Sequence, residues 1–137
     1  MGGCSEDLFE FVKPCAIEDG LKIAKNYWPG ALTIILPTVG NFSTYLNVNS
    51  SFLGFRVPAL KLARDLLMKT GPLATTSANI SGESPAKNEL EASIQFPGIP
   101  ILGPVPWPNS SGKASTIIEW RKKGKWKLLR AGSVIFS

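Results

Sequence analysis

Residues 27–37 read Tyr-Trp-Pro-Gly-Ala-Leu-Thr-Ile-Ile-Leu-Pro, and this stretch decides how the chain is organised. Before it, apolar residues recur at helical spacing over residues 17–28, and Pro29-Gly30 is a stop signal for that helix. Residues 31–36 form a compact apolar run rich in β-branched side chains, which predicts a buried strand ended by Pro37. A helix that leads at once into a buried strand is typical of chains that mix both elements.

Further helices and strands alternate toward the C-terminus. The sequence predicts strands at 52–57, 73–75 and 99–102, helices at 59–69 and 88–96, and a hairpin that pairs 115–120 with 126–129. The second helix starts with Asn88 and Glu91 at the spacing of a capping box. Because helices and strands are interleaved, we expect an α/β (α+β) fold around a mixed sheet.

The composition fits a single globular domain. The chain has 137 residues and a mass of 14.8 kDa, with 44% hydrophobic and 18% charged residues, so it can bury a core without a metal or disulfide. We expect one domain over residues 1–137. The first residues show no secretory signal, and the longest uncharged apolar run, 31–37, is too short to cross a bilayer. The sequence therefore predicts a cytoplasmic protein with no membrane partner.

Several kinds of catalytic site are excluded by what the sequence lacks. It contains no histidine, so a histidine base cannot operate within this chain. Its two cysteines, Cys4 and Cys15, cannot complete a structural zinc site, and we expect no metal site. A disulfide between them is one possibility; free, buried thiols are the favoured interpretation. The sequence also has no phosphate-binding P-loop, no G-x-G-x-x-G string and no paired carboxylates near an apolar strand, so no acid, base or nucleophile is assigned.

The remaining candidates are hydroxyl, amide and guanidinium groups at strand ends. Residues 75–79, Thr-Thr-Ser-Ala-Asn, offer several donors directly after a predicted strand, where α/β sheets bind ligands. These groups suit phosphate or carboxylate oxygens, although from composition alone a turn that satisfies its own backbone is the favoured interpretation. Arg56 is the only charge in the 52–57 strand, so it either clamps an anion or lies at an ordinary exposed position. Ser115 and Arg130 form the third group, at boundaries between strands and glycine-containing loops.

The C-terminal end is basic. Residues 121–137 contain six Lys or Arg and no acid, in a chain of net charge +5. This patch, Arg121, Lys122, Lys123, Lys125 and Lys127, fits contact with RNA or another polyanion, but also a solvated hairpin turn. For Trp120 and Trp126, which flank it, we favour packing over base stacking.

Taken together, these segments resemble the YrdC-domain family of threonylcarbamoyl-AMP synthases. The resemblance rests on strings spread over the whole chain: 27–37 with W-P-G-x-L-T, 54–58 with G-F-R-V-P, 71–82 with T-S-A-N-x-S-G, 115–118 with S-T-I-I, and 129–132 with L-R-A-G. The W-P-G-x-L-T and T-S-A-N-x-S-G strings are specific to this family.

The resemblance implies a fold, a reaction and a set of ligands. The family has a twisted mixed sheet with surrounding helices and a positively charged cavity. It condenses L-threonine, bicarbonate and ATP, with Mg²⁺ on the triphosphate, into threonylcarbamoyl-AMP for the t6A modification of tRNA, and some members bind double-stranded RNA. Other proteins of t6A synthesis are expected partners. The implied threonine-binding residues are Arg56, Thr75 and Ser115, and the implied ATP-binding residues are Ser77, Asn79 and Arg130.

One departure from the family concerns the N-terminus. Family members open with strands and with a Lys/Arg-rich segment followed by Pro-Leu, and nothing before Met1-Gly2-Gly3 corresponds to them. We therefore expect this chain to match the C-terminal portion of the family's domain, as a fragment, a mis-started sequence or a decayed gene. On that expectation the chain alone does not make threonylcarbamoyl-AMP, whereas an extended one does. The alternative function is a non-catalytic RNA- or nucleotide-binding remnant.

Overall fold

The computed structural model describes residues 1–40, 46, 50–109 and 111–136. Within it the chain divides into two compact units. Unit 1 comprises Met1–Ala74 together with Ala114–Ser137, and unit 2 comprises Thr75–Lys113. The mixed α/β class predicted from the sequence is confirmed.

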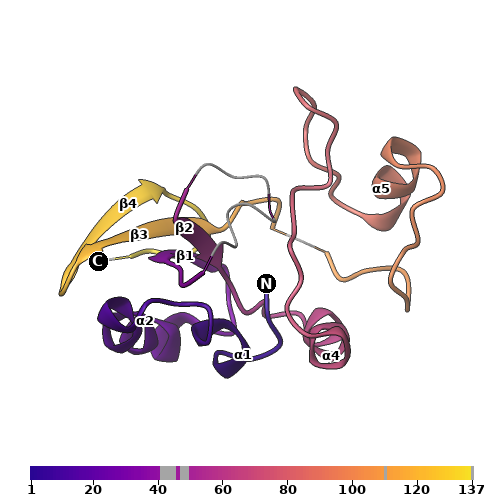
Figure 1. Ribbon diagram of the computed structural model, residues 1–137. Coiled ribbons are helices and arrows are strands. Elements are labelled where there is room, and N and C mark those ends of the chain that lie inside the picture. Colours follow the sequence, from indigo (N-terminus) through magenta and orange to yellow (C-terminus); the bar gives the residue numbers. More distant parts are fainter. Residues whose placement is uncertain (41–45, 47–49, 110, 137) are drawn as a thin grey trace. The chain divides into compact units, whose positions relative to one another are not determined.

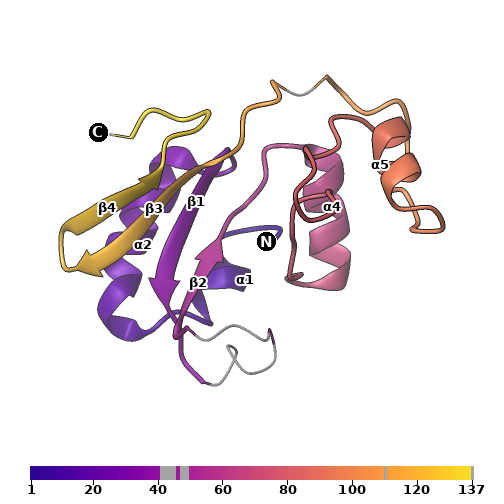
Figure 2. The same cartoon turned by 90° about the horizontal axis from the view of Figure 1, so that it is seen from above.

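Unit 1 is built on a four-stranded sheet with the order β2-β1-β3-β4. Its strands are β1 (Leu32–Pro37), β2 (Phe52–Phe55), β3 (Thr116–Lys122) and β4 (Lys125–Arg130). β1 runs parallel to β3, and β2 and β4 run antiparallel to their neighbours (Figure 2). The two parallel strands are far apart in sequence, and the outer strand on each side returns in the opposite direction.

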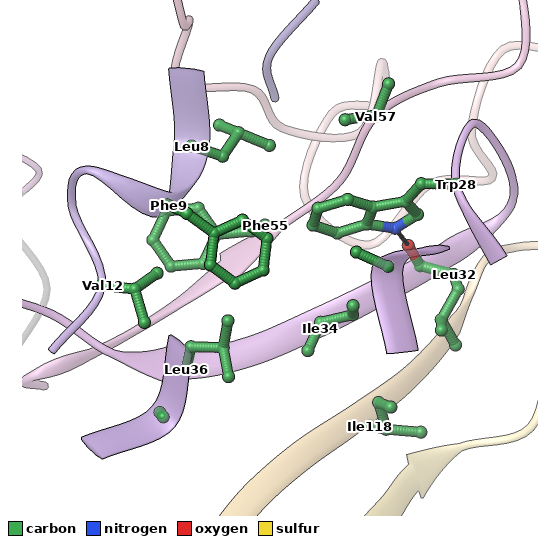
Figure 3. Packing of buried hydrophobic residues seen from close by; sticks show 12 residues of the cluster. Leu8, Phe9, Val12, Trp28, Leu32, Ile34, Leu36, Phe55, Val57 and Ile118 are labelled. Carbon is green, nitrogen blue, oxygen red and sulfur yellow. Dashed lines mark hydrogen bonds between the residues drawn. The ribbon is translucent and has the colours of Figure 1, made fainter. Parts of the chain in front are cut away.

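Two helices of unit 1, α1 (Glu6–Phe9) and α2 (Pro14–Tyr27), lie on the same side of the sheet (Figure 1). A third, α4 (Lys61–Thr70), follows β2 and buries Leu67. The core between α1, α2 and the sheet is apolar, with Phe9 and Trp28 packed ring against ring at 6.1 Å between centroids (Figure 3).

The alternation along β1 explains which face of the sheet is covered. Leu32, Ile34 and Leu36 have no exposed surface and point into this core, while the intervening Thr33 and Ile35 are only half-buried. Successive side chains of a strand point to opposite faces, so Thr33 and Ile35 lie on the face that α1 and α2 leave open. Of these two residues only Thr33 is polar, so β1 places one hydroxyl on the open face of the sheet.

Unit 2 has little core of its own. It contains α5 (Glu89–Gln95), and none of its described residues is buried. The predicted N-cap is present, because the Glu91 amide donates to Asn88 Oδ1 at 2.8 Å. The reciprocal bond of the predicted capping box is shifted by one residue: the Glu91 carboxylate accepts from the amide of Lys87, at 2.8 Å, and not from that of Asn88. Local hydrogen bonds therefore contribute more to its order than apolar packing does.

Two predicted strands are wrong. Residues 73–75 and 99–102 are irregular. Leu73 exchanges backbone hydrogen bonds with Met1 alone, because no further strand lies beside it among the described residues. In 99–102, Pro100 has no N–H to donate, and the Leu102 carbonyl accepts from the indole of Trp107 at 2.7 Å instead of from a strand.

The cysteines are free, as favoured from the sequence, but the prediction that they are buried is wrong. Cys4 is half-buried and Cys15 is exposed near the start of α2. No described helix is long and apolar enough to cross a membrane.

Candidate functional site

The topology brings four strand ends to one end of the sheet in unit 1. β1 and β3 begin there, because Leu32 pairs with Thr116 in the parallel register. β2 and β4 finish there, because they run the other way and pair Phe55 with Ile34 and Arg130 with Ile117. Arg56, Ser115 and Arg130 therefore lie at the same end of the sheet, although they are widely separated in sequence.

The turn that precedes β1 is built by the W-P-G string. The indole of Trp28 donates to the Leu32 carbonyl at 2.8 Å, which folds the turn back onto the strand. Gly30 is required in this turn, because a Cβ there would overlap the carbonyl oxygen of Tyr27. The Gly30 amide donates to the Val57 carbonyl at 2.9 Å, so the turn is tied to the segment that follows β2.

Arg56 is held by this turn. Its Nε donates to the Gly30 carbonyl at 2.8 Å, and the residue is half-buried. Burial lowers the pKa of its guanidinium, and among the described residues no carboxylate lies within ion-pair distance of it. A partly desolvated cation with no acidic partner among the described residues is well suited to bind an anion, because an unpaired buried charge is otherwise costly.

Ser115 and Arg130 meet directly. The Arg130 guanidinium donates through Nε and Nη2 to the Ser115 carbonyl, at 3.0 and 2.9 Å, and Nη2 also reaches Ser115 Oγ at 3.1 Å. These bonds fix the guanidinium against the start of β3 and leave its Nη1 edge for another acceptor. Arg130 also has no acidic partner among the described residues.

Thr33 belongs to this group and was not singled out from the sequence. Its Oγ1 lies 2.9 Å from Ser115 Oγ, and the two hydroxyls share one hydrogen bond. The signal was available, because Thr33 is the one polar side chain in the apolar run 31–36 and alternates with buried residues. Two hydroxyls and one fixed guanidinium therefore lie on the open face, at the end of the sheet that also carries Arg56.

Thr116 and Gly132 hold this group in place. Thr116 Oγ1 is buried, donates to the Val134 carbonyl at 2.6 Å, and accepts from the amides of Gly132 and Val134. A Cβ on Gly132 would lie 2.5 Å from the Thr116 nitrogen. The R-A-G string therefore packs its backbone directly against the S-T string, which is why Arg130 reaches Ser115.

The other predicted site residues, Thr75, Ser77 and Asn79, belong to unit 2. Thr75 and Ser77 are exposed, and Asn79 is half-buried. The Asn79 side chain supports the interpretation that this segment forms a turn that satisfies its own backbone. Its Nδ2 donates to the carbonyls of Ile80 and Glu83, both at 3.1 Å. Unit 1 thus brings together three of the predicted residues, and the other three lie close in sequence within unit 2.

The basic patch occupies the β3–β4 hairpin. Arg121 pairs with Glu119 at 3.0 Å, and Lys123 lies 3.8 Å from Glu18, so two of its five cations have acidic neighbours. The flanking Trp120 and Trp126 pack against the core, which confirms the favoured interpretation for them. The Trp120 indole and the Gly124 amide both donate to Asp19 Oδ2, at 2.8 and 2.7 Å.

The donor set at this end of the sheet does not resemble a metal site. Its side chains are hydroxyls and guanidiniums, and in the described part of the chain no group of three or more His, Cys, Asp or Glu could hold a metal ion. Such donors bind carboxylate or phosphate oxygens instead.

Comparison with known proteins gives consistent results. A family model described as "Telomere recombination", which groups Sua5, YciO and YrdC, matches residues 3–132. The chain is 35% identical over 91 residues to threonylcarbamoyl-AMP synthase of Idiomarina loihiensis, covering 65% of this chain and 49% of that protein. It is 40% identical over 70 residues to the synthase of Baumannia cicadellinicola, covering 50% and 35%. It therefore spans less than half the length of these curated relatives.

A solved structure is similar as well. The crystal structure of P. abyssi Sua5 complexed with L-threonine matches with a TM-score of 0.81 and 28% identity, over 94% of this chain and 38% of that one. The family strings and the fold thus point to the same group of proteins.

Proposed function

The chain belongs to the family that groups Sua5, YciO and YrdC, and we propose that it acts as an L-threonylcarbamoyladenylate synthase. The reaction joins L-threonine, bicarbonate and ATP into threonylcarbamoyl-AMP and releases pyrophosphate, for the t6A modification of tRNA. The curated relatives carry the name of this activity, and a structural relative has been crystallised with L-threonine.

Arg56 is the observation that carries the proposal. Its guanidinium is half-buried, anchored through Nε to Gly30, and without an acidic partner in the described residues. We assign it to the threonine carboxylate, which a guanidinium can bind through two parallel hydrogen bonds. Ser115, at the same end of the sheet and hydrogen-bonded to Thr33, is assigned to the same amino-acid subsite, together with Thr75.

The nucleotide is assigned to Arg130 and to the segment that contains Ser77 and Asn79. Arg130 keeps its Nη1 edge free of the bonds that hold it to Ser115. Magnesium would arrive on the triphosphate, since the donors at the site do not suit a resident metal. Catalysis on this proposal is electrostatic: fixed donors stabilise developing negative charge, and no covalent nucleophile takes part.

The interaction with RNA is a separate part of the proposal. Lys122, Lys125 and Lys127 are exposed on the hairpin, so their ammonium groups can bind the phosphate backbone of a nucleic acid. A tRNA or double-stranded RNA is the partner that this patch suits, alongside other proteins of t6A synthesis.

The test is the release of pyrophosphate from ATP by the purified chain. It is measured with threonine and bicarbonate both present, and then with each of them omitted in turn. Release that requires both co-substrates supports a synthase. Binding of threonine and ATP without release, both by this chain and by a version extended at its N-terminus, identifies the alternative, a non-catalytic nucleotide-binding protein. Absence of both binding and release contradicts the proposal.

A further inference from the structure

The hydroxyl of Ser115 is held from two sides. Thr33 Oγ1 lies 2.9 Å from Ser115 Oγ, and Arg130 Nη2 donates to the same oxygen at 3.1 Å. The contact with Thr33 is partly buried, whereas the contact with Arg130 is exposed to solvent. Because a hydrogen bond is stronger where water is partly excluded, Thr33 constrains the position of Ser115 Oγ more than Arg130 does.

The side chain of Thr33 is itself fixed by the two neighbouring strands. On the β2 side, a Cβ added at Gly54 would lie 3.1 Å from Thr33 Cγ2, so the methyl group faces β2. On the β3 side the hydroxyl faces Ser115, and the Thr116 amide donates to the Ala31 carbonyl at 2.9 Å, which joins the start of β3 to the start of β1. A β-branched side chain has few rotamers, so this packing keeps the Thr33 hydroxyl directed at Ser115.

The count of donors and acceptors shows what this contact does for Ser115. A hydroxyl has one O–H bond to donate and two lone pairs that accept, and a guanidinium can only donate. Arg130 therefore occupies one lone pair of Ser115 Oγ. Within the Thr33–Ser115 pair either hydroxyl can be the donor. Once Ser115 donates to the oxygen of a ligand, however, Thr33 must donate to Ser115, and both lone pairs of Ser115 are then in use.

We propose that Thr33 is a positioning residue, which aligns and polarises the Ser115 hydroxyl as a donor to an oxygen of the bound amino acid. The inference rests on the proposed function, because it takes Ser115 as part of the amino-acid subsite. A hydroxyl that accepts two hydrogen bonds is a better donor, since hydrogen bonds in a chain polarise one another. Thr33 thus acts on the ligand through Ser115 and not by contacting it.

The first test measures the affinity of the full chain for L-threonine by calorimetry. Thr33→Val keeps the shape of the side chain but removes its hydroxyl, and we expect the dissociation constant to rise ~3–10-fold, the effect of losing one hydrogen bond. Thr33→Ser retains the hydroxyl and should recover most of the affinity. Thr38→Val is the matched control: it removes a buried hydroxyl that donates to the Ser51 carbonyl beyond the other end of β1, so it should leave the affinity unchanged.

A double-mutant cycle separates positioning from direct contact with the ligand. If Thr33 acts through Ser115, then Ser115→Ala weakens the binding of L-threonine, and adding Thr33→Val weakens it no further. The same loss of affinity on Thr33→Val in both backgrounds would show that Thr33 acts independently of Ser115, and would overturn the proposal. Unchanged affinity in Thr33→Val alone would overturn it as well.

A second measurement needs no ligand, and it keeps the positioning role distinct from the proposed function. The Hα–Hβ coupling constants of Ser115, measured by NMR, report whether its side chain occupies one rotamer. We expect one rotamer in the unmodified chain and in Thr33→Ser, and averaged rotamers in Thr33→Val; equal couplings in all three would contradict the positioning role. If the unmodified chain binds no L-threonine, the amino-acid part of the proposed function fails, and the couplings alone decide the role of Thr33. If Thr33→Val does not fold, Thr33→Ala, which also removes the hydroxyl, takes its place.

Discussion

Arg56 is the residue on which the proposed site most depends. Replacing it with alanine removes a charge-assisted contact, and we expect the binding free energy of L-threonine to weaken by ~1.5–3 kcal/mol. Arg56→Lys, which keeps the charge but loses the planar fork, should recover only part of that loss. Calorimetry with both variants measures the effect. Equal threonine affinity in Arg56→Ala and the unmodified chain would remove Arg56 from the site.

Substitution of Thr116, the buried residue that follows Ser115, tests how the site is supported by the residues beneath it. Its buried hydroxyl bonds the Val134 carbonyl and the amides of Gly132 and Val134, so Thr116→Val keeps the shape but leaves these groups unpaired. We expect the free energy of unfolding to fall by at least ~1–2 kcal/mol. Thr116→Ser, which retains the hydroxyl, is the matched control and should lose less. Urea denaturation of the two variants gives the comparison, and equal losses would mean that the hydroxyl contributes nothing.

At the scale of elements, Asp19 ties α2 to the β3–β4 hairpin. It is 8% exposed, and hydrogen bonds from the Trp120 indole and the Gly124 amide lower the pKa of its carboxyl. A carboxyl whose pKa is lower in the folded state stabilises the fold above its unfolded pKa, about 4, and loses that contribution as the pH falls through the folded value. Asp19→Asn should therefore be clearly less stable than the unmodified chain at about pH 7, and this difference should shrink at about pH 3. A pH-independent difference in denaturation midpoint would contradict the assignment.

How far the elements could be predicted depends on how locally each is determined. The 31–36 strand, the Asn88 N-cap and the C-terminal hairpin were predicted correctly, because alternation and capping chemistry are local signals. The 73–75 and 99–102 strands were wrong, because a short apolar run becomes a strand only where a partner strand is available. The sequence left two interpretations of Arg56 open, because alternation along a strand does not show what covers each face of the sheet. Thr33 is recognisable in the sequence as the one polar residue of its run, but its place in the site depends on Ser115, which lies 82 positions away.

At the scale of the whole molecule, the two units should differ in stability. The described residues of unit 2 include no buried side chain, whereas β1 and β3 of unit 1 carry fully buried ones such as Ile34 and Ile118. Amide protons in regions with few buried apolar contacts exchange through low-energy local openings. Hydrogen exchange should therefore be slowest in β1 and β3 and fastest over residues 75–113. Equal protection in both units would contradict this account of where the stability lies.

The most direct test of the central claim compares two ligands that differ only at the carboxylate. On the proposed function, the half-buried Arg56 guanidinium at one end of the sheet recognises the carboxylate of the amino acid. Calorimetric titration of the full chain with L-threonine should give a binding isotherm, and titration with L-threoninamide, whose carboxylate is replaced by a neutral amide, should give none or one at least ~10-fold weaker. Equal affinity for the two ligands, or no binding of L-threonine, would contradict it.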